Sequence, residues 1–238
     1  VQTIQESASE QIFFDPQLVS DPTRGLFFPA SWGDRATPHL EGRGTVWQLE
    51  SSEGPWILKR YLRGGLVAHL MSEHYFFVGY ERTRMAREFS LLSSLHNIGL
   101  PVPRPVGAFI QRSGAALYTG SLITQCLEET QSLSSLIRSG GLSDAPWAAV
   151  GSTIRRFHDH GVNHRDLNAS NILLSRGDIS LIDFDRGRLI TARFNDSWKQ
   201  ANLQRLRRSL EKISTVQRSD LDNYWNRLLG AYAESSSG

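Results

Sequence analysis

The sequence has a single cysteine, Cys126, among its 238 residues. That excludes a disulfide within the chain and agrees with a reducing compartment. There is no apolar run near the roughly 20 residues that a membrane-spanning helix needs, and no basic segment followed by an apolar stretch, so no secretory signal is expected. No group of cysteines and histidines has the spacing of a zinc site. The formal net charge is only +2, so charge alone gives no reason to expect a nucleic-acid partner.

The strongest functional signal lies around residue 165. Residues 163–171 read Asn-His-Arg-Asp-Leu-Asn-Ala-Ser-Asn and match H-R-D-x-x-x-x-N at every fixed position. Residues 181–185, Leu-Ile-Asp-Phe-Asp, contain the first two residues of D-F-G. Between the two runs, short apolar stretches flank a turn signal, Arg-Gly-Asp at 176–178, which predicts a β-hairpin. The order and spacing of these parts resemble the catalytic centre of the protein-kinase-like fold.

Each fixed residue of this centre has a chemical role to fill. Asp166 can accept the proton of an attacking hydroxyl, whereas Asn171 and Asp183 can hold magnesium on a triphosphate. Asp185 stands where D-F-G has glycine. It could ligand metal, cap the next turn or pair with a neighbouring arginine, and the sequence does not choose among these roles.

The first half of the chain supplies candidates for nucleotide binding. Gly42 and Gly44 lie in a turn between two expected strands, where glycine lets backbone N–H groups approach phosphates closely. Lys59 follows on the next expected strand and is the candidate lysine for the phosphates.

A helix is expected over residues 83–96, because its apolar residues recur at helical spacing. Glu88 lies inside this helix and is expected to orient Lys59 through an ion pair, with Glu81 as the alternative partner. Glu88 could instead be a surface residue that pairs with Arg84 one turn earlier.

The order of elements is strands, a helix, more strands and then mostly helices. It predicts an α+β fold, two-lobed and protein-kinase-like, with a small, shortened C-lobe. Residues 1–124 are expected to form an N-terminal arm and a β-rich nucleotide-binding lobe, and residues 125–238 a mainly helical catalytic lobe. The arm, residues 1–35, is expected to be irregular. Only 51 residues follow Gly187 and no A-P-E is present, so a small hydroxylated acceptor is expected rather than a polypeptide.

The chain as a whole resembles the lipopolysaccharide kinase family, above all those members that phosphorylate 3-deoxy-D-manno-octulosonic acid (Kdo). Two specific runs carry the resemblance, residues 163–171 and 181–187, and shorter ones at 42–44, 58–61, 87–89 and 100–103 support it. The resemblance implies ATP and Mg²⁺ as cofactors, with Gln125 and Leu127 beside the nucleotide. It implies phosphorylation of the 4-hydroxyl of a Kdo sugar on lipid A.

The same resemblance implies a peripheral protein at the cytoplasmic face of a bacterial inner membrane, with a Kdo-bearing glycolipid as acceptor, no nucleic acid and no obligate protein partner. The segment between Lys59 and Glu88 is rich in aromatic residues and arginines, among them Arg63 and Arg82. It could bind the anionic acceptor or simply pack in the core. A second basic cluster could be a solvated helix face or a docking surface for phosphates and anionic headgroups; its members are Arg205, Arg207, Arg208 and Lys212.

Other functions remain open at the level of sequence. A lipopolysaccharide core heptose kinase and a choline- or aminoglycoside-type kinase would share the same catalytic parts. A nucleotide-binding scaffold without activity is the alternative from another class. The presence of Lys59, Asp166, Asn171 and Asp183 together favours an active enzyme.

Overall fold

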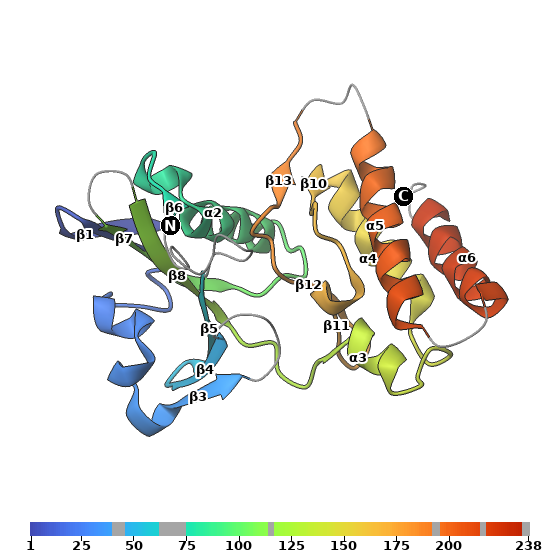
Figure 1. Ribbon diagram of the computed structural model, residues 1–238, viewed down its shortest axis with the longest axis horizontal. Helices are drawn as coiled ribbons and strands as arrows, with labels where there is room; N and C mark the ends of the chain where they lie inside the picture. The colour runs from blue at the N-terminus through green and yellow to red at the C-terminus, as the bar shows by residue number, and fades with distance from the viewer. Residues whose placement is uncertain (40–45, 62–74, 114–116, 192–195, 215–217, 235–238) are drawn as a thin grey trace. The chain divides into compact units, whose positions relative to one another are not determined.

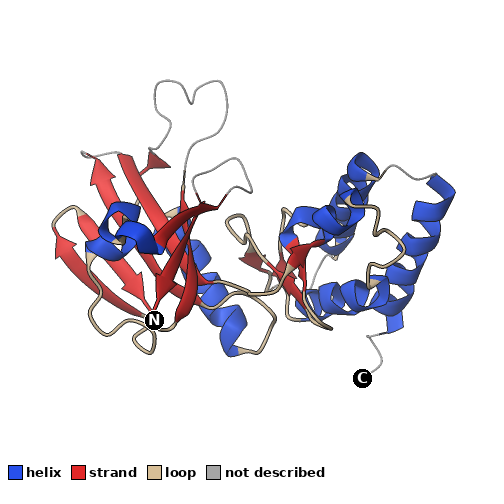
Figure 2. Cartoon of the chain, turned by 90° about the horizontal axis from the view of Figure 1, so that it is seen from below, coloured by secondary structure: helices blue, strands red, loops and turns tan. Residues whose placement is uncertain are grey.

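The computed structural model describes residues 1–39, 46–61, 75–113, 117–191, 196–214 and 218–234. The chain forms two compact units. The first comprises Val1–Ser94 and Pro103–Cys126, and the second Leu95–Val102 and Leu127–Gly238. Strands gather in the first unit and most of the helices in the second (Figure 2).

A single eight-stranded sheet forms the frame of the first unit (Figure 1). Its strands follow the order β1-β2-β7-β8-β5-β4-β3, β6 pairs with β8, and every pairing is antiparallel. The strands are β1 (Gln2–Ser7), β2 (Glu10–Phe14), β3 (Ala36–His39), β4 (Val46–Ser51), β5 (Gly54–Arg60), β6 (Tyr75–Phe76), β7 (Pro105–Ser113) and β8 (Leu117–Gln125).

Alternation along the strands places successive side chains on opposite faces of the sheet. In β5, Trp56 and Leu58 point into one buried cluster, which also takes in Phe27 and Trp32. Phe27 is the last residue of the 3-10 helix η1 (Arg24–Phe27), and Trp32 lies between two more, η2 (Pro29–Ser31) and η3 (Gly33–Arg35). Because side chains on a strand point alternately to opposite faces, Lys59 is directed away from this cluster.

The expectation of an irregular arm is wrong for residues 2–14. They form the β1–β2 hairpin, and β2 extends the sheet by pairing with β7. Ile12 and Phe14 are buried on one face of the new strand. Buried Glu10 accepts a hydrogen bond from Gln111 at 2.8 Å. Burial of these apolar side chains favours a strand here over a loose arm.

A helix, α2 (Arg84–Asn97), belongs largely to the first unit. It begins where the Thr83 hydroxyl accepts the Ala86 N–H at 3.4 Å, which is the usual way that threonine caps a helix. Met85, Phe89 and Leu92 are fully buried and lie on one face, as their spacing predicts. The helix expected over residues 83–96 is therefore confirmed to within one residue at each end.

The second unit holds helices and small β-ladders. Its elements are β9 (Gln131–Ser132), α3 (Leu133–Arg138), α4 (Trp147–Asp159), β10 (Val162–Asn163), η5 (Ala169–Asn171), β11 (Ile172–Leu174), β12 (Ile179–Leu181), β13 (Arg188–Leu189), α5 (Ser197–Ile213) and α6 (Arg218–Glu234). Helices α4 and α6 pack closely because residue 151 is glycine: a Cβ there would lie 2.1 Å from the Leu228 carbonyl oxygen. Within the described ranges, no helix has the length and apolar character that a bilayer span needs.

A buried histidine lies where α4, α5 and α6 meet. His158 is 3% exposed, and its Nδ1 is 2.8 Å from the Tyr232 hydroxyl. The Trp198 ring meets it edge-on at 5.1 Å between centroids. Burial is the main reason that the pKa of His158 is lowered to about 4; the Asn202 hydrogen bond and the Asp159 charge raise the pKa, and the Lys199 and Arg155 charges lower it. His158 is therefore neutral in the folded protein above that pH.

This histidine should make the second unit sensitive to acid. His158 has a pKa of 6.5 in the unfolded chain and of about 4 in the folded chain. Between these pH values the unfolded chain binds a proton at His158 and the folded chain does not, so the free energy of unfolding falls as the pH falls. The expected loss is up to about 3 kcal/mol, at about 1.4 kcal/mol per pH unit. Urea unfolding between pH 7 and 4 should show a shallower pH dependence in His158→Gln than in wild type. The exposed neighbour His160→Gln is the control, and equal slopes in all three proteins would rule the explanation out.

Candidate active site

The β11–β12 hairpin brings two of the expected metal ligands together. Ile172 pairs with Leu181, and the Asn171 carbonyl oxygen accepts the Ile182 N–H at 3.1 Å. Asn171 therefore lies at the open end of the hairpin, opposite the residue that precedes Asp183. The predicted hairpin is confirmed, with its turn at Arg176–Asp178.

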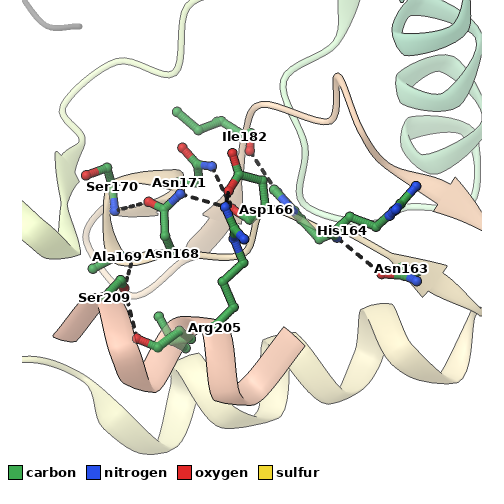
Figure 3. Close-up of polar contacts among 12 residues, drawn as sticks. Asn163, His164, Asp166, Asn168, Ala169, Ser170, Asn171, Ile182, Arg205 and Ser209 are labelled. Carbon is green, nitrogen blue, oxygen red and sulfur yellow. Dashed lines mark hydrogen bonds and ion pairs between the residues drawn. The ribbon is translucent and has the colours of Figure 1, made fainter. Parts of the chain in front are cut away.

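The loop that carries Asp166 is tied to the same end of the hairpin (Figure 3). The Asp166 main-chain carbonyl oxygen accepts the side-chain amides of Asn168 and Asn171, each at 3.0 Å. Asn168 also accepts the Ser170 N–H at 2.9 Å through its side-chain oxygen. With its amide nitrogen engaged in this way, Asn171 has its side-chain carbonyl oxygen left to offer to a ligand.

His164 joins the loop to the strand that leads into Asp183. Its Nε2 donates to the Ile182 carbonyl oxygen at 2.9 Å, and its ring lies 4.5 Å from the Phe184 ring between centroids. Phe184 in turn stacks on Phe157 of α4 at 5.9 Å. Burial lowers the pKa of His164, so the ring is neutral and Nε2 carries the proton that it donates. Histidine at this position thus fixes the relative placement of Asp166 and Asp183.

Two residues of the site hold a backbone conformation that L-amino acids seldom adopt. The φ angle is 58° at Arg165 and 65° at Asp183. Such conformations cost free energy and persist where the surroundings impose them, often at active sites. Here they turn the chain on either side of the hydrogen-bonded core of the site.

Sequence patterns missed three residues that reach this loop from α5. Asn202 accepts the His164 N–H at 3.1 Å and Ser209 accepts the Ala169 N–H at 2.9 Å. Arg205 Nε donates to Asp166 Oδ1 at 2.7 Å. Their spacing could have identified them, because positions 202, 205 and 209 lie on one face of a helix together with the buried Leu206.

The first unit forms a separate cluster around Lys59. Of the two candidate partners, Glu88 lies within reach, with 4.0 Å between Lys59 Nζ and Glu88 Oε1. Glu88 is 3% exposed and also accepts a hydrogen bond from the Tyr61 hydroxyl. Glu81 is exposed in η4 (Tyr80–Arg82). A buried carboxylate held by two partners is well placed to orient the lysine.

Of the remaining candidates for nucleotide binding, the structure describes Gln125 and Leu127 but not the two glycines. Gly42 and Gly44 lie outside the described residues, as does Arg63. Gln125 ends β8, and its N–H donates to the Arg104 carbonyl oxygen at 2.8 Å. Leu127 begins the longer segment of the second unit, and its carbonyl oxygen accepts the Thr130 hydroxyl at 2.8 Å.

The residues at the hairpin end fit a magnesium ion that also binds phosphate. Among the described residues no group of three or more His, Cys, Asp or Glu side chains could hold a metal by itself. Mg²⁺ commonly takes only one or two carboxylates from a protein and fills its shell with phosphate oxygens and water. One carboxylate, Asp183, and one amide oxygen, Asn171, meet that requirement in type, and Asn171 lies opposite the residue before Asp183.

Known proteins share both the sequence and the fold of this chain. The model of the lipopolysaccharide kinase (Kdo/WaaP) family matches residues 31–232. A protein of Xylella fastidiosa (strain M12) named 3-deoxy-D-manno-octulosonic acid kinase is 45% identical over 205 residues, covering 85% of this chain and 80% of that protein. One of the same name from Xanthomonas euvesicatoria pv. vesicatoria (strain 85-10) is 42% identical over 226 residues, covering 93% and 88%.

A solved structure, WaaP in complex with acyl carrier protein, resembles the chain with a TM-score of 0.53 and 21% identity, covering 87% of this chain and 80% of that one. This likeness confirms the predicted fold class, α+β and protein-kinase-like.

Proposed function

The chain belongs to the lipopolysaccharide kinase (Kdo/WaaP) family, and we propose that it transfers phosphate from ATP to the 4-hydroxyl of a Kdo sugar on lipid A. Membership of this family makes the chain a phosphotransferase. One structural observation supports phosphoryl transfer as the reaction. Asp166, Asn171 and the residue before Asp183 are joined by direct hydrogen bonds at one end of the β11–β12 hairpin.

Asp166 is proposed as the group that receives the acceptor's proton. The acceptor hydroxyl oxygen attacks the terminal phosphorus of ATP, a new oxygen–phosphorus bond forms, and the bond to the departing ADP oxygen breaks. The hydroxyl proton passes to the Asp166 carboxylate, which is 31% exposed and so open to a substrate. The loop hydrogen bonds described above hold the main chain of Asp166 still during this transfer.

Asn171 and Asp183 are proposed to hold magnesium through oxygen atoms. When bound, magnesium would neutralise charge on the phosphates. His164 supports this role because its hydrogen bond to Ile182 fixes the residue that precedes Asp183.

In the first unit, Lys59 is proposed to bind ATP phosphates, with Glu88 and Tyr61 orienting it. Gly42 and Gly44 are proposed to present backbone N–H groups to the same phosphates. Gln125, the last residue of β8, and Leu127, two residues further along the chain, are proposed to contact the rest of the nucleotide.

We also propose that the protein is a peripheral protein at the cytoplasmic face of a bacterial inner membrane, where it would bind its glycolipid acceptor. Phe76 and Val78 support this, because they are 67% and 64% exposed and apolar side chains of this kind insert into a lipid interface. Arg82, four residues beyond Val78, is also exposed and could meet an anionic headgroup.

Acceptor preference tests the proposal. Purified protein with Mg-ATP would be offered lipid A carrying one Kdo, a heptosylated core, choline and an aminoglycoside. We expect kcat/KM to be highest for Kdo-bearing lipid A, by at least about tenfold, since a site built for one polar acceptor rejects others strongly. Preference for the heptosylated core would instead identify a heptose kinase. Nucleotide binding without transfer to any of the four would identify a binding scaffold.

A further inference from the structure

One face of α5 carries polar side chains between buried leucines. Asn202, Arg205 and Ser209 recur three and four residues apart, beside the fully buried Leu206 and Leu210. Residues at this spacing lie on the same side of a helix. Asn202 is 3% exposed, so its polar atoms need hydrogen-bond partners, and all three polar residues find partners in the loop that carries Asp166.

Two of these residues hold the ends of the loop. Asn202 accepts the His164 N–H at 3.1 Å and donates to the Asn163 side-chain oxygen at 2.9 Å. Ser209 accepts the Ala169 N–H at 2.9 Å. The main chain before and after Asp166 is therefore anchored to a rigid helix.

Arg205 reaches the middle of the loop and contacts the carboxylate itself (Figure 3). Its Nε donates to Asp166 Oδ1 at 2.7 Å, and its second guanidinium nitrogen pairs with the same oxygen. Both contacts fall on Oδ1, so Oδ2 is not engaged by Arg205. The two side chains are 44% and 31% exposed, which leaves the pair accessible to small solutes.

We infer that Arg205 is a positioning residue for phosphoryl transfer, which fixes the rotamer of Asp166 through Oδ1 and directs Oδ2 to the acceptor hydroxyl. The inference rests on the proposed role of Asp166. A planar guanidinium with two donors on one oxygen restricts a carboxylate more than a single ammonium does. Placement of a reacting group matters steeply, since a shift of about 1 Å can cost roughly 10²-fold in rate.

The basic cluster on α5 is only partly available as a docking surface for phosphates. Arg205 pairs with Asp166, and Arg207 pairs with Glu211 at 3.0 Å and with Asp222 of α6. Two of the four cations are thus held by carboxylates of the same unit. Arg208 is exposed, one turn along from Arg205, and serves as a matched control for the loss of one positive charge.

The test begins with kcat and KM of the full chain for Mg-ATP and Kdo-bearing lipid A. Arg205→Ala should lower kcat by roughly 10- to 100-fold with the KM for ATP within about twofold, because it disturbs the base and not nucleotide binding. Arg205→Lys should recover part of the loss, and Arg208→Ala should keep the wild-type kcat. Guanidinium chloride at tens of millimolar should partly restore Arg205→Ala relative to the same concentration of sodium chloride.

A double-mutant cycle with Asp166→Asn separates this inference from the proposed function. If Arg205 acts through Asp166, Arg205→Ala should cause little further loss in the Asp166→Asn background. The inference alone would be overturned if Arg205→Ala lowered kcat equally in the wild-type and the Asp166→Asn backgrounds. It would also be overturned if Arg205→Ala kept the wild-type kcat while Asp166→Asn was impaired. An unimpaired Asp166→Asn would overturn the proposed role of Asp166, on which the inference rests, while transfer to Kdo-bearing lipid A would still stand. If Arg205→Ala loses ATP binding, the cycle is repeated with Arg205→Gln, which keeps most of the side chain. The same outcomes then support or overturn the inference.

Discussion

Replacing Asp166 by asparagine should lower turnover by ~10²- to 10⁴-fold while leaving ATP binding nearly intact. Asparagine has almost the same shape, but its side-chain oxygen cannot take the proton that the acceptor hydroxyl must lose. The main-chain carbonyl of residue 166 would still accept the amides of Asn168 and Asn171, so the loop should keep its form. Steady-state kinetics with Kdo-bearing lipid A, together with calorimetric titration of Mg-ATP, measure the two effects separately.

Asp178→Asn is the matched control for this change. Asp178 is an exposed aspartate in the turn of the β11–β12 hairpin, away from the end that holds Asn171. The control should have the wild-type kcat. Wild-type turnover in Asp166→Asn would remove Asp166 from the mechanism and return attention to other acidic residues of the second unit.

Replacing Asp183 by alanine should abolish measurable transfer, a loss of roughly 10³-fold or more, because the charge on the phosphates would no longer be compensated. The same variant should lose the magnesium dependence of ATP binding. Calorimetry of ATP binding with and without Mg²⁺ measures this directly. A variant whose ATP affinity still rises with magnesium as in wild type would exclude Asp183 as a ligand.

The backbone at Asp183 requires a second variant. With φ at 65°, alanine in place of Asp183 would be strained as well as unable to bind metal. Glycine adopts this conformation freely, so Asp183→Gly removes the carboxylate without adding strain. Both variants should be inactive if the ligand matters, whereas activity in the glycine variant alone would mean that the alanine result came from the backbone.

The sequence predicted those parts of the molecule that short-range patterns encode. The hairpin that carries Asn171 and Asp183 follows from two apolar stretches around a glycine turn, and α2 follows from its helical apolar spacing. The protein-kinase-like fold class follows from the order of elements and from the spacing of Asp166, Asn171 and Asp183.

Features that depend on distant contacts were not predictable in this way. Residues 2–14 look irregular by themselves; β2 becomes a strand because β7 offers it a hydrogen-bonding edge, and β1 then pairs with β2. Arg205 looked like one member of a basic helix face, and only the packing of α5 against the loop brings it to Asp166. Tyr61 belongs to the aromatic segment that could bind the acceptor or pack in the core; it is 5% exposed and donates to Glu88. In each case a long-range partner decides the role of the residue.

The central claim is tested most directly by the chemical identity of the product. Lipid A carrying a single Kdo would be incubated with the wild-type protein and Mg-ATP, and the product examined by tandem mass spectrometry and phosphorus NMR. The proposed function predicts one new phosphomonoester per molecule, at the 4-position of Kdo. Unchanged glycolipid after prolonged incubation with nucleotide-binding protein, or phosphate attached at any other position, would contradict it.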